Sequence, residues 1–198
     1  MAAGNQAARQ DRHREAEQHF AEALQQAETF GPQDPRLASS LLRLGAAYYL
    51  QEKYTEAEPL CQRALAIREL ALGPAHLDVA ESLVMLGHIA FARAKYAEAE
   101  GYYTRALAIQ EKAVGFEDRQ LTSTLYPLAQ SYVLQRKYVE AERYYRRFLT
   151  IQERVLGPGD PVLASHLDFY AELLRRGNRG AEAAEVEARA KAIRAKRP

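Results

Sequence analysis

The sequence predicts an all-α solenoid built from repeated helix pairs, and three observations support this prediction. Within each period of the chain, two successive segments place apolar residues at helical spacing. No segment shows the strict alternation of apolar and polar residues that is typical of a strand. The period is 42 residues long, as four glycines show: Gly31, Gly73, Gly115 and Gly157. Repetition at this interval indicates one helix pair per period, packed against its neighbours.

The first half of each period is predicted to form one helix, called helix A. In the first full unit, Leu41, Leu44 and Tyr48 lie at i, i+3 and i+7, which is one face of a helix. Asp34 stands just before this segment, where its carboxylate can accept hydrogen bonds from the free N–H groups of the first turn. Pro35 then takes the first helical position, where proline is tolerated.

The second half of each period is predicted to form helix B. Ala57, Cys61 and Ala64 continue the helical spacing after a polar break at residues 52–53. Gly73 fits the end of this helix, because the residue after the last turn often adopts a left-handed conformation that favours glycine. In the first full unit the two predicted helices therefore cover about residues 36–51 and 54–71.

The two ends of the chain depart from this pattern. Before Gly31 there is only a B-type helix without a partner, which indicates either a half-repeat cap or a fragment of a longer protein. The last unit loses the repeated tyrosine and becomes more polar, as expected of a terminal repeat that faces water. The predicted organisation is a single array over residues 1–198: a leading helix at 12–30, repeats at 35–72, 77–114 and 119–156, and a divergent capping repeat at 161–195.

The repeated block resembles a known family. Each block contains Tyr-x-Glu-Ala-Glu, beginning at Tyr54, Tyr96 and Tyr138, and the first two continue with Arg-Ala-Leu-x-Ile-x-Glu. With small residues at Gly45 and Ala57, the spacing is similar to that of the tetratricopeptide repeat, in the 42-residue form found in kinesin light chains and related bacterial proteins. The resemblance covers about residues 12–197. It implies a right-handed superhelical solenoid of antiparallel helix pairs whose A helices line the concave side.

The composition excludes several classes of protein. The chain has 27 Lys and Arg against 26 Asp and Glu, so we expect no nucleic-acid partner, which would require clustered positive charge. No run approaches the ~18 apolar residues that a membrane span needs. The first residues lack the apolar block of a signal peptide. With only one cysteine no internal disulfide can form, and we expect a cytoplasmic protein or a fragment of one.

No pattern of residues indicates catalysis, and we expect no enzyme, no metal and no cofactor. The five histidines lack the spacing of a zinc motif. Cys61 is interpreted as a small apolar core residue, with a reactive thiol as the lesser alternative. The glycines at 157–160 lack the Lys-Ser/Thr of a phosphate loop and are interpreted as a turn. The glutamates Glu56/Glu58, Glu98/Glu100 and Glu140/Glu142 recur in the first three repeats, so we interpret them as a solvated or inter-repeat ion-pairing face and not as a catalytic pair.

The candidate binding residues lie on helix A, next to the packing stripe. A step of one residue turns by ~100° around a helix. The family resemblance implies that this neighbouring stripe faces the groove. It is mostly apolar or aromatic in three units, and an exposed surface of that kind usually marks a binding site. The predicted peptide-binding groove comprises Leu42, Arg43, Tyr49, Val84, Met85, His88, Phe91, Tyr126, Gln130, Val133 and Phe169.

The sequence therefore predicts a non-enzymatic scaffold that binds an apolar or aromatic peptide or helix in its groove. The resemblance excludes capture of a free C-terminal carboxylate in the manner of heat-shock co-chaperones, because the corresponding positions lack charged donors. One alternative is a self-assembling module that forms a homo-oligomer. Another is an anion or nucleic-acid binder that uses the basic segment 175–198. Coverage of the groove by the N-terminal residues of the chain also stays open.

Two further expectations concern single residues in this groove. Pro127 lies inside the third helix A, where its ring would clash with the carbonyl of Ser123. We therefore expect a kink there or a helix that restarts near Thr124. His88 either gains a proton near pH 6 and weakens binding, or is a partly buried neutral histidine.

Overall fold

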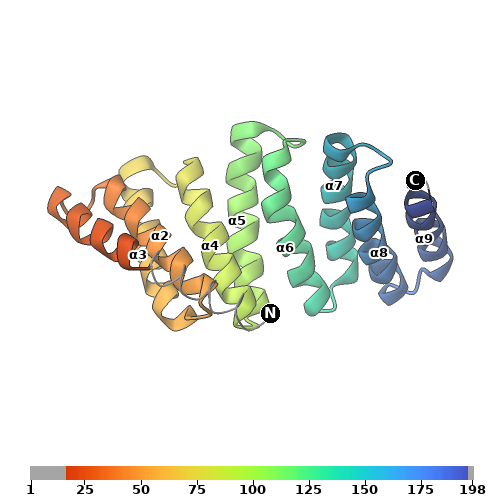
Figure 1. Cartoon of the computed structure of the whole chain (residues 1–198), viewed down its shortest axis with the longest axis horizontal. Coiled ribbons are helices and arrows are strands. Elements are labelled where there is room, and N and C mark those ends of the chain that lie inside the picture. The colour runs from red at the N-terminus through yellow and green to blue at the C-terminus, as the bar shows by residue number, and fades with distance from the viewer. Residues whose placement is uncertain (1–16, 196–198) are drawn as a thin grey trace, which may run out of the picture. The chain divides into compact units, whose positions relative to one another are not determined.

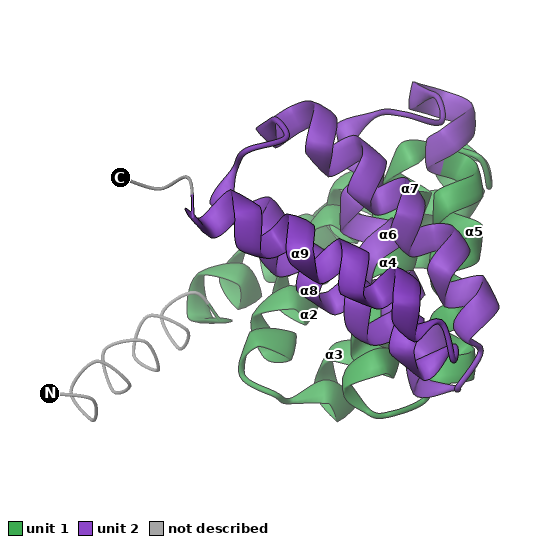
Figure 2. Cartoon of the chain, turned by 90° about the vertical axis from the view of Figure 1, so that its right-hand side faces the viewer, with its two compact units in different colours: residues 1–109 green, residues 110–198 purple. Residues whose placement is uncertain are grey.

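The computed structural model describes residues 17–195, and within this range all regular elements are helices (Figure 1). The all-α repeat fold predicted from the sequence is thus confirmed. The chain divides into two compact units, residues 1–109 and 110–198, which are coloured separately in Figure 2 and are described one at a time. Of the predicted leading helix at 12–30, the first residues lie outside the described range, and residues 17–27 are helical.

In the first unit, the helical residues 17–27 lead into a short 3-10 helix, η1 (Glu28–Phe30). Two helix pairs follow, with three-residue connections inside each pair that make the paired helices antiparallel. These helices are α2 (Pro35–Leu50), α3 (Tyr54–Leu72), α4 (Leu77–Ala92) and α5 (Tyr96–Val114), of which α5 continues into the second unit.

Local chemistry explains where the A helices begin and end. The Asp34 carboxylate accepts a hydrogen bond from the backbone N–H of Arg36 at 2.8 Å, and Pro35 opens α2 as expected. At the other end, Glu52 adopts a positive φ of 61°, and the N–H of Lys53 bonds back to the carbonyl of Tyr48 at 2.9 Å. This is a Schellman-type stop built on a non-glycine residue. The same positive φ recurs at the equivalent positions of the later pairs: Ala94, Arg136 and Asn178.

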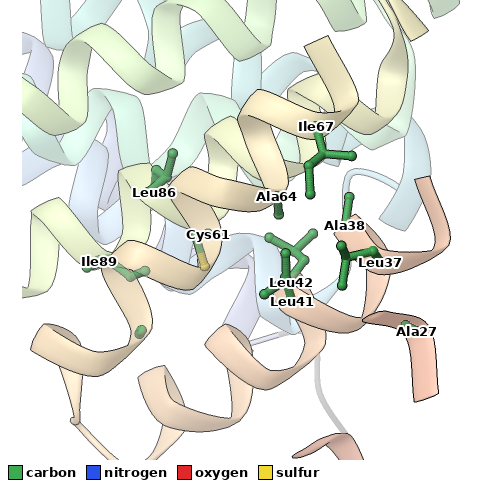
Figure 3. Packing of buried hydrophobic residues seen from close by; sticks show 11 residues of the cluster. Ala27, Leu37, Ala38, Leu41, Leu42, Cys61, Ala64, Ile67, Leu86 and Ile89 are labelled. Atoms are coloured by element: carbon green, nitrogen blue, oxygen red, sulfur yellow. The ribbon is translucent and has the colours of Figure 1, made fainter. Parts of the chain in front are cut away.

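The core of the first unit is assembled from successive helices, as Figure 3 shows for α2, α3 and α4. Gly45 allows α2 and α3 to approach closely, because a Cβ at this position would lie 2.5 Å from the sulfur of Cys61. Cys61 is fully buried, and burial raises the pKa of its thiol to about 12. The interpretation of Cys61 as an apolar core residue is confirmed. The labelled core residues are Ala27, Leu37, Ala38, Leu41, Leu42, Cys61, Ala64, Ile67, Leu86 and Ile89.

The second unit has the same plan, with one change at its start. Its helices are η2 (Arg119–Leu121), α6 (Thr122–Leu134), α7 (Tyr138–Leu156), α8 (Pro161–Arg176) and α9 (Gly180–Ala195). The α-helical part of α6 begins at Thr122, preceded by the 3-10 turn, and Pro127 is accommodated inside it. The α-helix thus starts two residues before the predicted restart at Thr124.

Ion pairs between successive B-type helices recur at the period of the repeat. In each of these ion pairs, a glutamate near the end of one B-type helix faces an arginine in the next B-type helix along the chain. The carboxylates of Glu58 and Glu142 form a further set with Arg93 and Arg179, which confirms the ion-pairing interpretation for these two residues. The recurring B-helix pairs are Glu28–Arg63, Glu69–Arg105, Glu111–Arg147 and Glu153–Arg189.

Candidate functional site

In the first unit, predicted groove residues from two A helices meet. The ring of Tyr49 on α2 lies 6.1 Å from the ring of His88 on α4, measured between centroids. Tyr49 also contacts Tyr54, with centroids 5.7 Å apart, and Phe91 contacts Tyr96 at 5.5 Å. Tyr49, His88 and Phe91 are all partly exposed. The first unit therefore presents an aromatic surface that bridges α2 and α4.

His88 is supported from beneath by Tyr103 of α5. The Nδ1 atom of His88 and the phenol oxygen of Tyr103 share a hydrogen bond of 2.7 Å, and Tyr103 is fully buried. Burial lowers the pKa of His88 and raises the pKa of Tyr103. Both groups are consequently neutral at pH 7. Of the two expectations for His88, the neutral and partly buried histidine agrees with this environment, and protonation requires a pH below its ordinary range.

In the second unit, Tyr126 of α6 is the centre of a larger aromatic cluster. Its ring lies 5.1 Å from Phe148 on α7 and 5.9 Å from Phe169 on α8, between centroids. Tyr145 packs on Phe169 at 4.8 Å and donates a hydrogen bond of 3.0 Å to the backbone carbonyl of His166. Two predicted groove residues from successive A helices, Tyr126 and Phe169, are thereby joined in this unit too.

Two of the predicted groove residues are not available for binding. Leu42 is 6% exposed and packs in the hydrophobic cluster of the first unit, and Val133 is 8% exposed. The prediction that these two side chains line a groove is wrong. A side chain beside the packing stripe is buried wherever a neighbouring helix packs over it. Helical spacing alone does not show how much of the helix surface a neighbour buries.

The remaining predicted residues divide into three groups. Val84 and Met85 are partly exposed but pack against the hydrophobic clusters of the first unit. Arg43 is exposed and Gln130 is partly exposed, so these two add polar groups to the A-helix surface. Tyr49 with His88, and Tyr126 with Phe169, are the predicted residues that combine partial exposure with contact to one another, whereas the partly exposed Phe91 contacts Tyr96.

The supporting aromatic residues were not predicted as part of the site. Tyr103 and Tyr145 stand where the first repeat has Cys61, and Phe148 stands where the two earlier repeats have alanine. The sequence did contain a signal for these supporting residues, because large rings stand at positions where other repeats have small residues. They show that the space between helices is filled differently in each repeat, and that aromatic side chains from B helices reach the A helices.

On α8, charged side chains lie at and next to the predicted groove positions, and they form ion pairs with other side chains of the chain. Asp168 forms an ion pair with Arg194, and Glu172 accepts a hydrogen bond of 2.9 Å from Arg176. Arg175 pairs with Glu187 of α9. In the last described pair, these carboxylates and guanidinium groups therefore neutralise one another.

The described residues contain no group of three or more His, Cys, Asp or Glu side chains that could hold a metal ion. Within residues 17–195, no helix is both long enough and apolar enough to cross a membrane.

The fold and these aromatic surfaces define an all-helical repeat protein whose units are antiparallel helix pairs. The tetratricopeptide repeat family matches the sequence over residues 2–58, 38–112 and 120–196. The chain belongs to the tetratricopeptide repeat family. No protein of curated function matches the sequence.

Solved structures confirm the resemblance to the kinesin light chain type of repeat. BtubC (BKLC) from P. vanneervenii is 25% identical, with a TM-score of 0.83 over 94% of this chain and 75% of that one. A kinesin light chain candidate of Podosopora anserina with nearly identical TPR-like repeats is 22% identical, with a TM-score of 0.81 over 98% and 93%. MamA of Desulfovibrio magneticus RS-1 shares the fold at 15% identity, with a TM-score of 0.70 over 100% and 94%.

Tetratricopeptide repeats typically form non-catalytic scaffolds, and in general terms the chain is a scaffold for protein interactions.

Proposed function

We propose that the chain binds an apolar or aromatic segment of a partner protein, as a peptide or a helix, on the A-helix surfaces. One observation supports this proposal above the others. In each unit, an aromatic residue predicted for the groove contacts another predicted groove residue on the next A helix: Tyr49 with His88, and Tyr126 with Phe169. All four side chains stay partly exposed, so they can extend their packing onto a ligand.

Aromatic side chains suit this role for a physical reason. Each buries a large area and has few rotatable bonds, so ordering it on a ligand loses little conformational entropy. The rings of Tyr49 and Tyr126 are already held by neighbouring rings, which lowers this cost further. Aromatic anchors of this kind commonly lose about 2 kcal/mol of binding free energy when truncated.

The character of the surface favours an apolar ligand. Burial keeps His88 neutral, and Gln130 adds an uncharged amide. Arg43 is the charged member of the predicted groove. Arg175 and Arg194 of the last pair are engaged by carboxylates of the chain, so a polyanion at the basic C-terminal segment would have to displace Glu187 from Arg175 and Asp168 from Arg194.

The test is a comparison of three variants in a binding assay. Native lysate is passed over the immobilised chain, and recovered partners are measured against Tyr49→Ala, Tyr126→Ala and a control, Leu70→Ala. Leu70 is 65% exposed on α3, a B helix, so its truncation removes exposed apolar area away from the A-helix surface. The proposal requires at least one partner whose affinity falls roughly 10-fold or more in a tyrosine variant and stays unchanged in the control.

Equal binding by all three variants would overturn the proposal, provided that circular dichroism shows each to be folded. Light scattering over a range of concentrations tests the self-assembly alternative. If the chain forms an oligomer that Tyr49→Ala and Tyr126→Ala disperse, then the A-helix surface binds a second copy in place of another protein.

A further inference from the structure

We propose a second binding site in the second unit, on a surface separate from the aromatic one: a pocket that holds the carboxylate or phosphate group of a single side chain displayed by a partner protein. It lies between the loop after α5 and the middle of α7. The cavity measures about 250 Å³, and its walls are Phe116, Glu117, Arg146, Arg147, Thr150, Ile151 and Arg154.

Helical spacing brings the polar wall together. Arg146, Thr150 and Arg154 lie at i, i+4 and i+8 on α7, so they follow one face of the helix. Arg147 and Ile151 occupy the adjacent face and complete the wall toward the loop. Three guanidinium groups and one hydroxyl group thus surround a single small cavity.

The three arginines differ in how firmly they are already paired. Arg147 forms an ion pair of 2.6 Å with Glu111, and Arg154 forms one of 2.6 Å with Glu117. Arg146 is 67% exposed and lies 4.0 Å from a Glu142 oxygen, a carboxylate that Arg179 also engages. Arg146 is therefore the guanidinium that an incoming anion can engage at the lowest cost. Among the residues that line the pocket, Glu117 carries the one carboxylate.

The repeat serves as an internal control for this pocket. Arg147 and Ile151 have the same residue types at the equivalent positions of the other helix pairs, as the packing of the repeat requires. Thr150 and Phe116 depart from the repeat only here: the other repeats have alanine at 66, 108 and 192, and proline at 32, 74 and 158. The position of Arg146 differs in every repeat, and Arg154 lies at a position that is also basic in Lys112 and Lys196.

These departures are difficult to explain by folding. Phe116 is 68% exposed, and its ring lies 5.8 Å from the guanidinium carbon of Arg147. An exposed phenylalanine in a turn adds no core. Residues that depart from the repeat without adding to the core and that gather around one cavity are those expected to serve a ligand.

The chemistry of the wall identifies the ligand class. Guanidinium groups bind the planar carboxylate and the phosphate group through paired, charge-assisted hydrogen bonds. The cavity is smaller than the roughly 300–1,000 Å³ typical of small-molecule sites, so it fits one acidic or phosphorylated side chain of a protein. Phe116 and the aliphatic part of the arginines can cover the apolar stem of that side chain.

The pocket makes opposite predictions for two of its residues. Arg146→Gln introduces the residue type that the first repeat has at the equivalent position, and it removes the most available cation. Affinity for an anion should therefore fall about 2- to 5-fold at this exposed position. Glu117→Gln removes the carboxylate that competes for Arg154, so affinity should rise by a similar factor. Arg143→Gln is the matched control, because it removes the same charge from an exposed α7 position outside the pocket.

The experiment is an NMR titration of the full chain at constant ionic strength. The probes are N-acetylglutamate amide and N-acetyl-O-phosphoserine amide, with acetamide as the uncharged reference. The backbone signal of Phe116 and the guanidinium signals of Arg146 and Arg154 should shift saturably with at least one anionic probe. Which of the two binds more tightly identifies a carboxylate or a phosphate as the natural group.

Three results would overturn the proposal: no saturable shift up to about 50 mM of either probe, well beyond millimolar affinity; the same loss of affinity in Arg143→Gln as in Arg146→Gln; or no gain in Glu117→Gln. The spectrum of each variant also reports whether it is folded. The aromatic surface plays no part in this titration, so its outcome is independent of the function proposed above.

Discussion

Tyr103 and Tyr145 occupy the same position in successive repeats, are both fully buried, and yet turn their hydroxyl groups to different partners. Tyr103 bonds to His88 on helix A of its own repeat. Tyr145 bonds to the carbonyl of His166 on helix A of the following repeat. One repeat thus uses its tyrosine to close a helix pair, and the other uses it to join neighbouring pairs.

At the helix A position beside the ring of Tyr103, the two repeats differ by a single methyl group. A Cβ added at Gly87 would lie 2.5 Å from the ring of Tyr103, so that ring occupies the space beside a glycine. The equivalent residue in the next repeat is Ala129, which carries the Cβ that Gly87 lacks. The ring of Tyr145 instead packs on Phe169, with centroids 4.8 Å apart. Close packing allows one arrangement or the other, because no spare volume permits both.

The largest effect should come from adding the missing methyl group. Gly87→Ala forces the ring of Tyr103 out of its position, and we expect a loss of about 1–3 kcal/mol in the free energy of unfolding. Urea denaturation measures this change. Tyr103→Leu in the same chain should relieve much of the loss, because a leucine side chain can withdraw from the added Cβ. Additive effects of the two substitutions would contradict the steric explanation.

The reverse substitution provides the matched comparison. Ala129→Gly creates no clash, and its cost should be about 1 kcal/mol, as for a glycine in any helix interior. If it destabilises the protein as much as Gly87→Ala does, the two positions are not distinguished by space beside the ring.

Removing the two hydroxyl groups should have unequal effects. Tyr103→Phe leaves the Nδ1 atom of His88 without its partner in a partly buried place, and we expect a loss of about 1–2 kcal/mol. Tyr145→Phe should cost less, about 0.5–1 kcal/mol, because a carbonyl inside α8 also accepts the helical hydrogen bond. Thermal unfolding of the two variants tests this order, and the reverse order would show that the His88 contact is not the stronger one.

The stability of the protein should depend on pH through His88. Burial lowers the pKa of this imidazole in the folded chain, so the unfolded chain binds the proton more readily. The contribution of neutral His88 is fully present above its unfolded pKa of about 6.5, and it is lost as the pH falls from there toward the lower folded value. His88→Gln, which introduces the residue type of Gln130, should weaken this dependence between pH 7 and pH 5. An unchanged slope in urea titrations would exclude His88 as the origin, leaving His166, whose pKa burial also lowers.

The smallest effects should come from the ion pairs between B-type helices. Glu111 is 17% exposed and lies 2.6 Å from Arg147, whereas Glu28 is 52% exposed and lies 3.5 Å from Arg63. Glu111→Gln should therefore cost about 1 kcal/mol or less, and Glu28→Gln should cause no measurable change, because water screens exposed pairs. Raising the salt concentration should reduce the Glu111 effect, and an effect that salt leaves unchanged would indicate lost packing instead.

The sequence by itself determined the fold class, the family and the type of repeat. Residues such as Gly73, Ala57 and Tyr54 recur because every repeat must solve the same packing problem, and recurrence can be seen without a structure. It also placed Tyr49, His88, Tyr126 and Phe169 on one side of their helices. In the structure, Tyr49 contacts His88 in the first unit, and Tyr126 contacts Phe169 in the second. Their role in binding stays a prediction.

Only the tertiary structure decided how deeply each residue lies and which partner it meets. Leu42 and Val133 have the spacing of surface residues, but they are only 6% and 8% exposed. The space that the ring of Tyr103 occupies depends on the missing Cβ of Gly87 on another helix, and the arginine pocket depends on a loop that meets α7. The physical reason is common to all of these. Periodicity reports the angle of a side chain around its own helix, whereas burial and contact depend on the volume that other helices leave open.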